Sequence, residues 1–104
     1  DFVFLKSKSQ YEKVFFREII FIEALDNYSS IYTTSKKYTI NSYLRDFFAH
    51  LPTDKFARIH RSYVVSIDAI KAIEDNLLLL NNNTSIPVSK SYKKEFMEKF
   101  RLFS

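Results

Sequence analysis

Cationic side chains stand immediately before one apolar stretch of this chain. The window contains no acidic residue and comprises Lys55, Arg58, His60 and Arg61. It leads into YVVSI, residues 63 to 67, which predicts a buried strand. A guanidinium is a rigid fork of donors that fits phosphates and base edges. A catalytic triad is not indicated, because Ser62 is too close to His60 in the chain. These residues indicate anion binding from a loop before the strand.

A second group of cations opens a predicted helix and comprises Lys90, Lys93 and Lys94. Lysines in a first helical turn oppose the helix dipole, at a cost of roughly 0.3 to 1 kcal/mol each. Free amide groups and ammonium charges at a helix start can bind a phosphate together. Alternatively, Glu95 and Glu98 on the next turn compensate these charges, and the lysines are only solvated.

Composition excludes several kinds of protein. The 104 residues are 46% hydrophobic and 17% aromatic, which predicts one packed domain over residues 1 to 104. The chain has neither cysteine nor glycine, which excludes disulfides, thiolate metal sites and glycine-rich phosphate loops. No apolar run is long enough to span a membrane, so we expect no membrane contact. The net charge of +4 favours anionic partners or only supports solubility.

No group of side chains converges on a catalytic centre. His50 lies near the end of the first predicted helix, where it can interact with the helix dipole. Glu23 lies inside an apolar strand, where a carboxylate either has a raised pKa or pairs with a buried lysine or arginine. Two histidines without cysteine make a poor metal set. We therefore expect no catalytic residue, metal or cofactor, and a protein that is not an enzyme.

Most of the chain predicts short strands joined by hairpins. The segments are 2–7, 11–17, 19–25, 28–34, 37–41, 63–67, 70–74, 77–81 and a short strand within 82–88 with Pro87 on an edge. Segment 19–25 is almost continuously apolar, which indicates burial on both faces. Turns at Asp26–Asn27 and Asp75–Asn76 indicate antiparallel pairing. The predicted fold class is mainly β with two short helices.

Both helices are expected from apolar stripes. The first stripe comprises Leu44, Phe47, Phe48 and Leu51, and the second comprises Tyr92, Phe96, Phe100 and Phe103. Asn41 or Ser42 can cap the first helix, which Pro52 ends. We expect Phe47 and Phe96 to lie in the core.

Four stretches in order resemble the LytTR family of bacterial DNA-binding domains. They are IIFIEALDNYSSIYT at 19–33, SYLRDFFAHLP at 42–52, FARIHRSYVVSIDAI at 56–70 and IPVSKSYKKEF at 86–96. The resemblance implies small antiparallel sheets stacked in an elongated sandwich, with DNA approached by loops. Carried over residue by residue, it implies DNA contacts at Asn27, Tyr28, Ser29, His60, Arg61, Ser89 and Lys90, with Lys93 following on the same helix.

The chain departs from the family pattern at three places. Ser66 stands where asparagine is frequent, and Asn81 to Asn83 where glycine is frequent, although asparagine tolerates positive φ. Lys90 stands where arginine is frequent, and because lysine lacks the bidentate fork, a phosphate contact is the expectation there. At Arg61 the alternative to base readout is an ion pair with Glu23 or Asp26.

The resemblance implies sequence-specific binding of double-stranded DNA by the output module of a bacterial two-component response regulator. It further implies an upstream receiver or sensor domain, a cytoplasmic location and direct-repeat sites bound by two copies. The alternative is a β-rich protein-interaction domain that does not read DNA.

Overall fold

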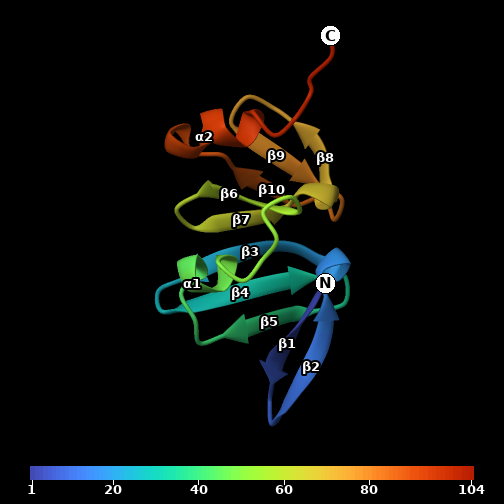
Figure 1. The fold of residues 1–104 in the computed structure, drawn as a ribbon, viewed down its shortest axis with the longest axis vertical. Helices are drawn as coiled ribbons and strands as arrows, with labels where there is room; N and C mark the ends of the chain where they lie inside the picture. Colours follow the sequence, from blue (N-terminus) through green and yellow to red (C-terminus); the bar gives the residue numbers. More distant parts are fainter.

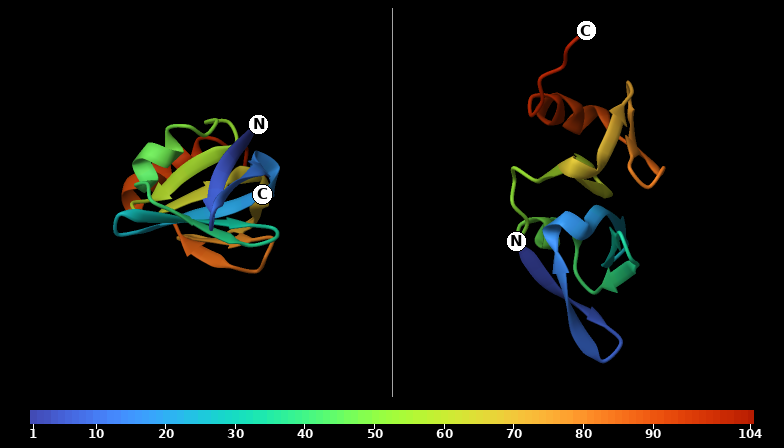
Figure 2. Two further views of the ribbon diagram at one scale, coloured as in Figure 1. Left: turned by 90° about the horizontal axis from the view of Figure 1, so that it is seen from below. Right: turned by 90° about the vertical axis from the view of Figure 1, so that its right-hand side faces the viewer.

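The computed structural model describes residues 1–104 as an elongated molecule, 49 × 23 × 22 Å along its principal axes. Three antiparallel sheets lie one above another along the long axis (Figure 1). The N-terminus lies at mid-height and the C-terminus at the upper end (Figure 2). This architecture, with two short helices, confirms the expected fold class.

The elements follow one another in a simple order. The lowest sheet pairs β1 (Phe2–Ser7) with β2 (Gln10–Phe15). The middle sheet has the order β5-β4-β3-β7-β6 and comprises β3 (Ile19–Leu25), β4 (Tyr28–Thr33), β5 (Lys37–Ile40), β6 (Phe56–His60) and β7 (Tyr63–Ser66). The upper sheet has the order β10-β9-β8 and comprises β8 (Ile70–Ile73), β9 (Leu77–Leu80) and β10 (Ser85–Pro87). The helices are α1 (Leu44–Phe48) and α2 (Lys90–Met97), and single 3-10 turns at Phe16–Glu18 and Ile67–Ala69 precede β3 and β8.

Strand β3 is buried on both faces because the middle sheet separates two hydrophobic cores. Ile19 and Ile22 belong to the lower core, whereas Ile20 and Phe21 belong to the upper core. Successive side chains of a regular strand point to opposite faces. This distribution therefore needs the irregularity that shifts the β3–β4 register between Ile19 and Phe21. The expectation of burial on both faces is confirmed for Ile19 to Ile22.

The helices close the two cores from opposite sides of the middle sheet. Helix α1 adds Leu44 and Phe47 to the lower core, which also contains Leu5 and Val14 of the hairpin. Helix α2 packs against β6 and adds Phe96, 1% exposed, to the upper core. Phe47 and Phe96 are therefore core residues, as expected.

A hydrogen-bonded cluster joins the β1–β2 hairpin to the edge of the middle sheet. The Glu12 carboxylate accepts hydrogen bonds from the Lys36 ammonium and the Tyr38 hydroxyl, each at 2.8 Å. Lys36, followed by Tyr38 and Gln10, lowers the pKa of Glu12 from 4.5 to about 2. Burial, followed by the neighbouring Glu12 carboxylate, raises the pKa of Tyr38, so its hydroxyl remains a donor at neutral pH. The hairpin is thus held by a charged contact as well as by Leu5 and Val14.

A strand replaces one expected loop, and one turn forms without glycine. Residues 56–60 form β6, although a loop was expected before the strand at 63–67, because Phe56, Ala57 and Ile59 each bury a side chain. The turn at Asn81 to Asn83 forms without glycine, since Asn83 adopts φ 68°.

The start of α1 and the end of α2 differ from the expected ones. The residue that caps α1 is Tyr43, whose side chain makes no capping hydrogen bond, in place of Asn41 or Ser42. Helix α2 ends at Met97, so Phe103 lies beyond it and is 88% exposed. The Phe96 and Phe100 rings still pack edge to face at 4.9 Å.

No helix has the length and apolar character that crossing a membrane requires.

Replacing Phe96 by alanine is expected to lower the free energy of unfolding by about 3 to 5 kcal/mol, because it empties a fully buried site. Phe103→Ala is the matched control, since its ring is exposed and its loss should cost less than about 0.5 kcal/mol. Chemical denaturation of both variants measures the difference, and equal losses would contradict the assigned core.

Glu12→Gln should change the pH dependence of stability. Because folding lowers the pKa of Glu12, the charged carboxylate stabilises the fold fully above about pH 4.5 and loses this effect as the pH falls towards 2. The stability difference between the parent chain and the variant should therefore be largest at neutral pH and vanish near pH 2. Guanidinium titrations across this range test it, and a constant difference would show that the ionised carboxylate is not responsible.

Candidate nucleic-acid interface

The side chain of Arg58 braces the β6–β7 turn. Its Nε donates to the His60 carbonyl at 2.8 Å, and a terminal guanidinium nitrogen donates to the Arg61 carbonyl. The Arg58 guanidinium also lies 5.7 Å from the centre of the Tyr92 ring on α2. Both carbonyls of the turn are therefore held by one half-buried side chain, which leaves Arg58 little freedom to contact a ligand. The sequence pattern did not reveal this role.

His60 presents one particular nitrogen outwards. The Ser62 amide donates to Nδ1 of His60 at 3.0 Å, and the ring lies 5.4 Å from the Tyr63 ring. A neutral imidazole that accepts at Nδ1 carries its proton on Nε2. His60 can therefore donate one hydrogen bond to a phosphate or base acceptor. The half-buried ring is oriented by the turn before any ligand arrives.

Arg61 occupies the exposed tip of the same turn and makes no ion pair. Glu23 accepts from the Tyr32 hydroxyl at 3.2 Å and from the Tyr63 hydroxyl at 3.0 Å. Burial, together with Glu23, raises the pKa of both tyrosines, so they remain donors at neutral pH. The expected lysine or arginine partner of Glu23 is therefore wrong. Arg61 remains available for an external acceptor.

The β3–β4 turn lies beside the β6–β7 turn. The Ala24 amide donates to the Ser62 carbonyl at 2.8 Å, which extends the β3–β7 pairing to the end of the sheet. Asp26 takes φ 54° in the turn, and Asn27 and Tyr28 are exposed. Both predicted loops are therefore fixed side by side at the same end of the middle sheet.

Ser29 differs from its two neighbours because it is fully buried. Its hydroxyl donates to the Ser42 carbonyl at 2.7 Å, which links β4 to the segment before α1. Its side chain supports the turn from inside and is not displayed on the surface.

The start of α2 lies next to these two turns, and the three together form a row of loops. The Ser89 amide donates to the Ile59 carbonyl at 2.8 Å, so Ser89 lies next to the strand that leads into Arg61. Lys90 and Lys94 are exposed and make no ion pair. Lys93 donates to Asp75 at 2.8 Å, and this hydrogen bond lowers the pKa of Asp75. The acid that balances this lysine is therefore in the β8–β9 turn, which the spacing along the helix did not indicate.

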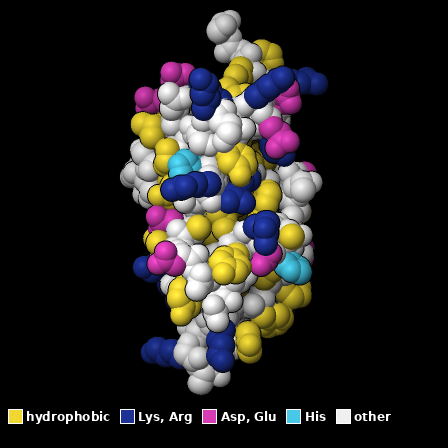
Figure 3. Space-filling view, turned by 90° about the vertical axis from the view of Figure 1, so that its left-hand side faces the viewer, with side chains coloured by type: hydrophobic (Ala, Val, Ile, Leu, Met, Phe, Trp, Pro, Cys, Tyr) yellow, Lys and Arg dark blue, Asp and Glu magenta, His cyan; other side chains and the backbone are white.

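The row of loops forms a cationic face on one side of the molecule. Figure 3 shows Lys and Arg side chains gathered across the middle of this face, with a histidine beside them and several Asp and Glu side chains around them. A hollow of about 320 Å³ lies between the β3–β4 turn and α1, where Arg45, Arg58 and Arg61 surround it together with Asp26. Lys55 does not belong here, because its carbonyl accepts from the Ile67 amide at the opposite end of β6 and β7.

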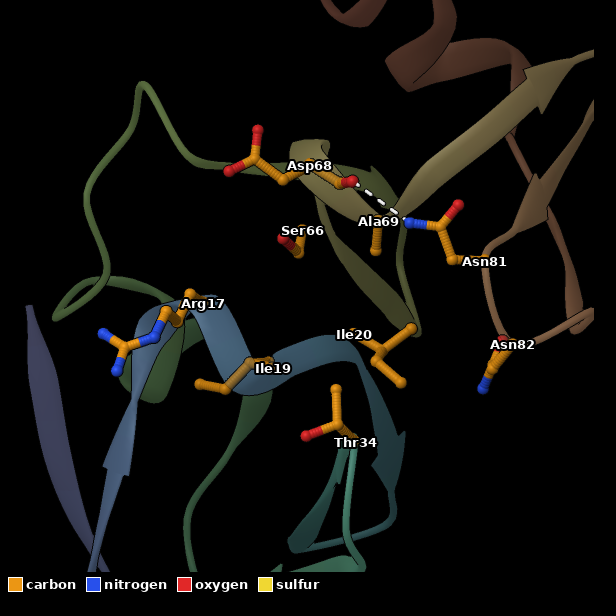
Figure 4. A pocket seen from close by; sticks show the side chains of 9 residues that line it. All are labelled: Arg17, Ile19, Ile20, Thr34, Ser66, Asp68, Ala69, Asn81 and Asn82. Carbon is orange, nitrogen blue, oxygen red and sulfur yellow. Dashed lines mark hydrogen bonds between the residues drawn. The ribbon is translucent and has the colours of Figure 1, made fainter.

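Another hollow, of about 280 Å³, lies at that opposite end, beneath the 3-10 turn before β8 (Figure 4). Its charged residues are Arg17 and Asp68, and their charged groups point away from the hollow in Figure 4. The side-chain Nδ2 of Asn81 donates to the backbone carbonyl of Asp68 at 3.3 Å across the upper rim of the hollow. The charged groups of Arg17 and Asp68 therefore do not meet inside the hollow.

The fold and this face define a small β-rich module whose cations and polar groups are displayed on loops, as in a nucleic-acid-binding domain. The family model described as the LytTr DNA-binding domain matches residues 9–101, and the chain belongs to this family of DNA-binding domains.

Similar proteins carry the same domain. The transcriptional regulatory protein YpdB of Escherichia coli O6:H1 is 32% identical in an alignment of 91 residues that covers 82% of this chain and 37% of YpdB. The sensory transduction protein LytT of Bacillus subtilis is 32% identical in an alignment of 84 residues that covers 76% of this chain and 35% of LytT. The chain thus spans little more than a third of these curated relatives. A solved LytTr DNA-binding domain of a Bacillus cereus protein, described as a methyl-accepting/DNA response regulator, superposes with a TM-score of 0.85 at 33% identity over 94% of each chain.

Arg58→Ala should loosen the β6–β7 turn. The loss of hydrogen bonds from a charged donor is expected to lower the free energy of unfolding by about 1.5 kcal/mol and to speed amide exchange at Arg61 and Ser62. Arg45→Ala is the control, because its pair with Asp46 at 3.5 Å is exposed. Hydrogen-exchange NMR of both variants tests the brace, and unchanged exchange in the turn would refute it.

Proposed function

We propose that this chain binds double-stranded DNA sequence-specifically as the output module of a bacterial transcription regulator. The observation that carries the proposal is the row of three loops, joined by backbone hydrogen bonds and displaying an unpaired Arg61 on a cationic face. Membership of the LytTr DNA-binding family supports it.

The exposed side chains divide into base-reading and phosphate-binding groups. Arg61 is suited to guanine, whose O6 and N7 accept both arms of a guanidinium in the major groove. Asn27 and the Nε2–H of His60 lie on the same row and can add contacts to base edges. Lys90 and Lys94 at the start of α2 are suited to phosphates, with the Ser89 hydroxyl beside them. Lys93 is expected to bind phosphate more weakly than Lys90 and Lys94, because its ion pair with Asp75 must open first.

The dimensions fit a duplex that lies along the long axis. The molecule is 49 Å long, whereas one turn of B-DNA occupies about 34 to 36 Å. A row of loops along this axis can therefore address successive grooves on one face of the DNA. The braced turns also reduce the conformational entropy that docking would otherwise cost.

The context of the whole protein is part of the same proposal. Curated relatives about three times as long as the matched segment support a receiver or sensor domain elsewhere in the full-length chain. Two copies on direct repeats would read a longer site than one row of loops, and DNA binding of this kind implies a cytoplasmic location.

Arg61→Ala is expected to weaken binding to the preferred site by about 1 to 3 kcal/mol and to weaken binding to random duplex much less. The preferred site comes from selection on random duplex DNA, and affinities are compared at one fixed salt concentration. Arg17→Ala is the matched control, because Arg17 lies at the opposite end of the strands. Equal losses on both DNAs would assign Arg61 to a phosphate. Salt-independent weak binding by the parent chain would favour the protein-interaction alternative.

A further inference from the structure

The row of loops continues into a groove that contains only one of the predicted DNA contacts, Tyr28. This groove has a volume of about 610 Å³ and lies between the β1–β2 hairpin and the segment that joins β5 to α1. Tyr28 of the β3–β4 turn is one of its lining residues, so the groove begins where the proposed DNA-contacting row ends. Figure 3 shows Lys and Arg side chains again at the lower end of the same face.

All polar side chains that line the groove can donate hydrogen bonds. Lys6 and Lys8 line it, the eleven lining residues include no acid, and neither lysine takes part in an ion pair. Tyr11 is 66% exposed and Tyr28 is 50% exposed, and their hydroxyls make no hydrogen bond within the chain. Ammonium, tyrosine and amide donors without a competing carboxylate are the groups that proteins use on phosphate oxygens.

The nearest acid of the hairpin is directed elsewhere. Glu12 follows Tyr11 in β2, so its side chain points to the opposite face of the strand. There it is bound by Lys36 and Tyr38, which fix the hairpin to the middle sheet. The hairpin is therefore held in place by one face while its other face displays Lys6 and Tyr11, with the Lys6 ammonium 5.8 Å from the Tyr11 ring centre.

We propose that this groove binds the phosphodiester backbone of duplex DNA beyond the bases contacted by the β3–β4 turn, through Lys6, Lys8, Tyr11 and Tyr28. The proposal rests on the proposed function and adds a sequence-independent anchor at one end of the recognition row. A duplex extended on that side gains contacts, whereas a duplex that ends at the β3–β4 turn does not. The hairpin thereby sets how much flanking DNA the domain covers.

The test uses the 104-residue chain and two duplexes that share one selected site. One duplex ends at the base pairs contacted by the β3–β4 turn, and the other continues on that side for one helical turn, about ten base pairs. Fluorescence anisotropy over a series of salt concentrations gives the slope of log affinity against log salt. Each phosphate contact contributes about 0.9 to this slope.

The parent chain should show the steeper slope on the longer duplex. The double variant Lys6→Ala, Lys8→Ala should lose nearly two units there and almost nothing on the shorter duplex. The double variant Lys55→Ala, Lys71→Ala removes the same charge from exposed positions outside the groove and should keep the parent slope on both. Equal thermal midpoints for the three proteins show that the fold is intact.

Several results would overturn the proposal. Parent-like slopes for the Lys6, Lys8 variant would exclude backbone contacts in the groove, and equal losses in the control variant would reduce the effect to net charge. Binding of a fluorescent oligoglutamate peptide that these two lysines support, without any change in the DNA slope, would assign the groove to an acidic protein partner. If the parent chain binds no duplex at all, the proposed function itself fails. If it binds DNA but the groove makes no contact with the duplex, only the further inference fails.

Discussion

The burial of β3 on both faces is the constraint on which the rest of the structure depends. The irregularity near Ile20 sends Ile19 and Ile22 into one core and Ile20 and Phe21 into the other. A single strand thereby contributes side chains to both cores. The hairpin and α1 then cover one side, and the upper sheet and α2 cover the other. The elongated shape follows from this stacking.

The same arrangement positions the functional loops. The β3–β4 and β6–β7 turns lie at one end of the middle sheet because β3 and β7 are antiparallel neighbours. Backbone hydrogen bonds at Ala24 and Ser89 extend this order from the β3–β4 turn to the start of α2. Arg58 adds a side-chain brace to the turn that carries Arg61. Hydrogen bonds therefore fix the backbone of these loops to the sheet, which suits the readout of base edges by the side chains that they carry.

Sequence patterns predicted the elements with a strong local signal and missed those without one. The alternating strands, the hairpin turns and the stripe containing Phe96 were found because periodicity and turn residues are local properties. Strand β6 was missed because its cations concealed the burial of Phe56, Ala57 and Ile59. The end of α2 before Phe103 was missed because an apolar residue can continue a helical period without any core to pack against.

The sequence by itself determined the mainly β class, the family resemblance and the polar residues on the loops. These depend on residue types and short spacings. Only the tertiary structure decided which of the candidate residues are available. Ser29 is buried and donates to the Ser42 carbonyl, and Lys93 is paired with Asp75. Lys55 lies at the other end of the strands. Arg61 remains free because two tyrosine hydroxyls donate to Glu23. The physical reason is that hydrogen bonding and burial depend on neighbours in space, and these neighbours come from strands and turns far apart in the chain.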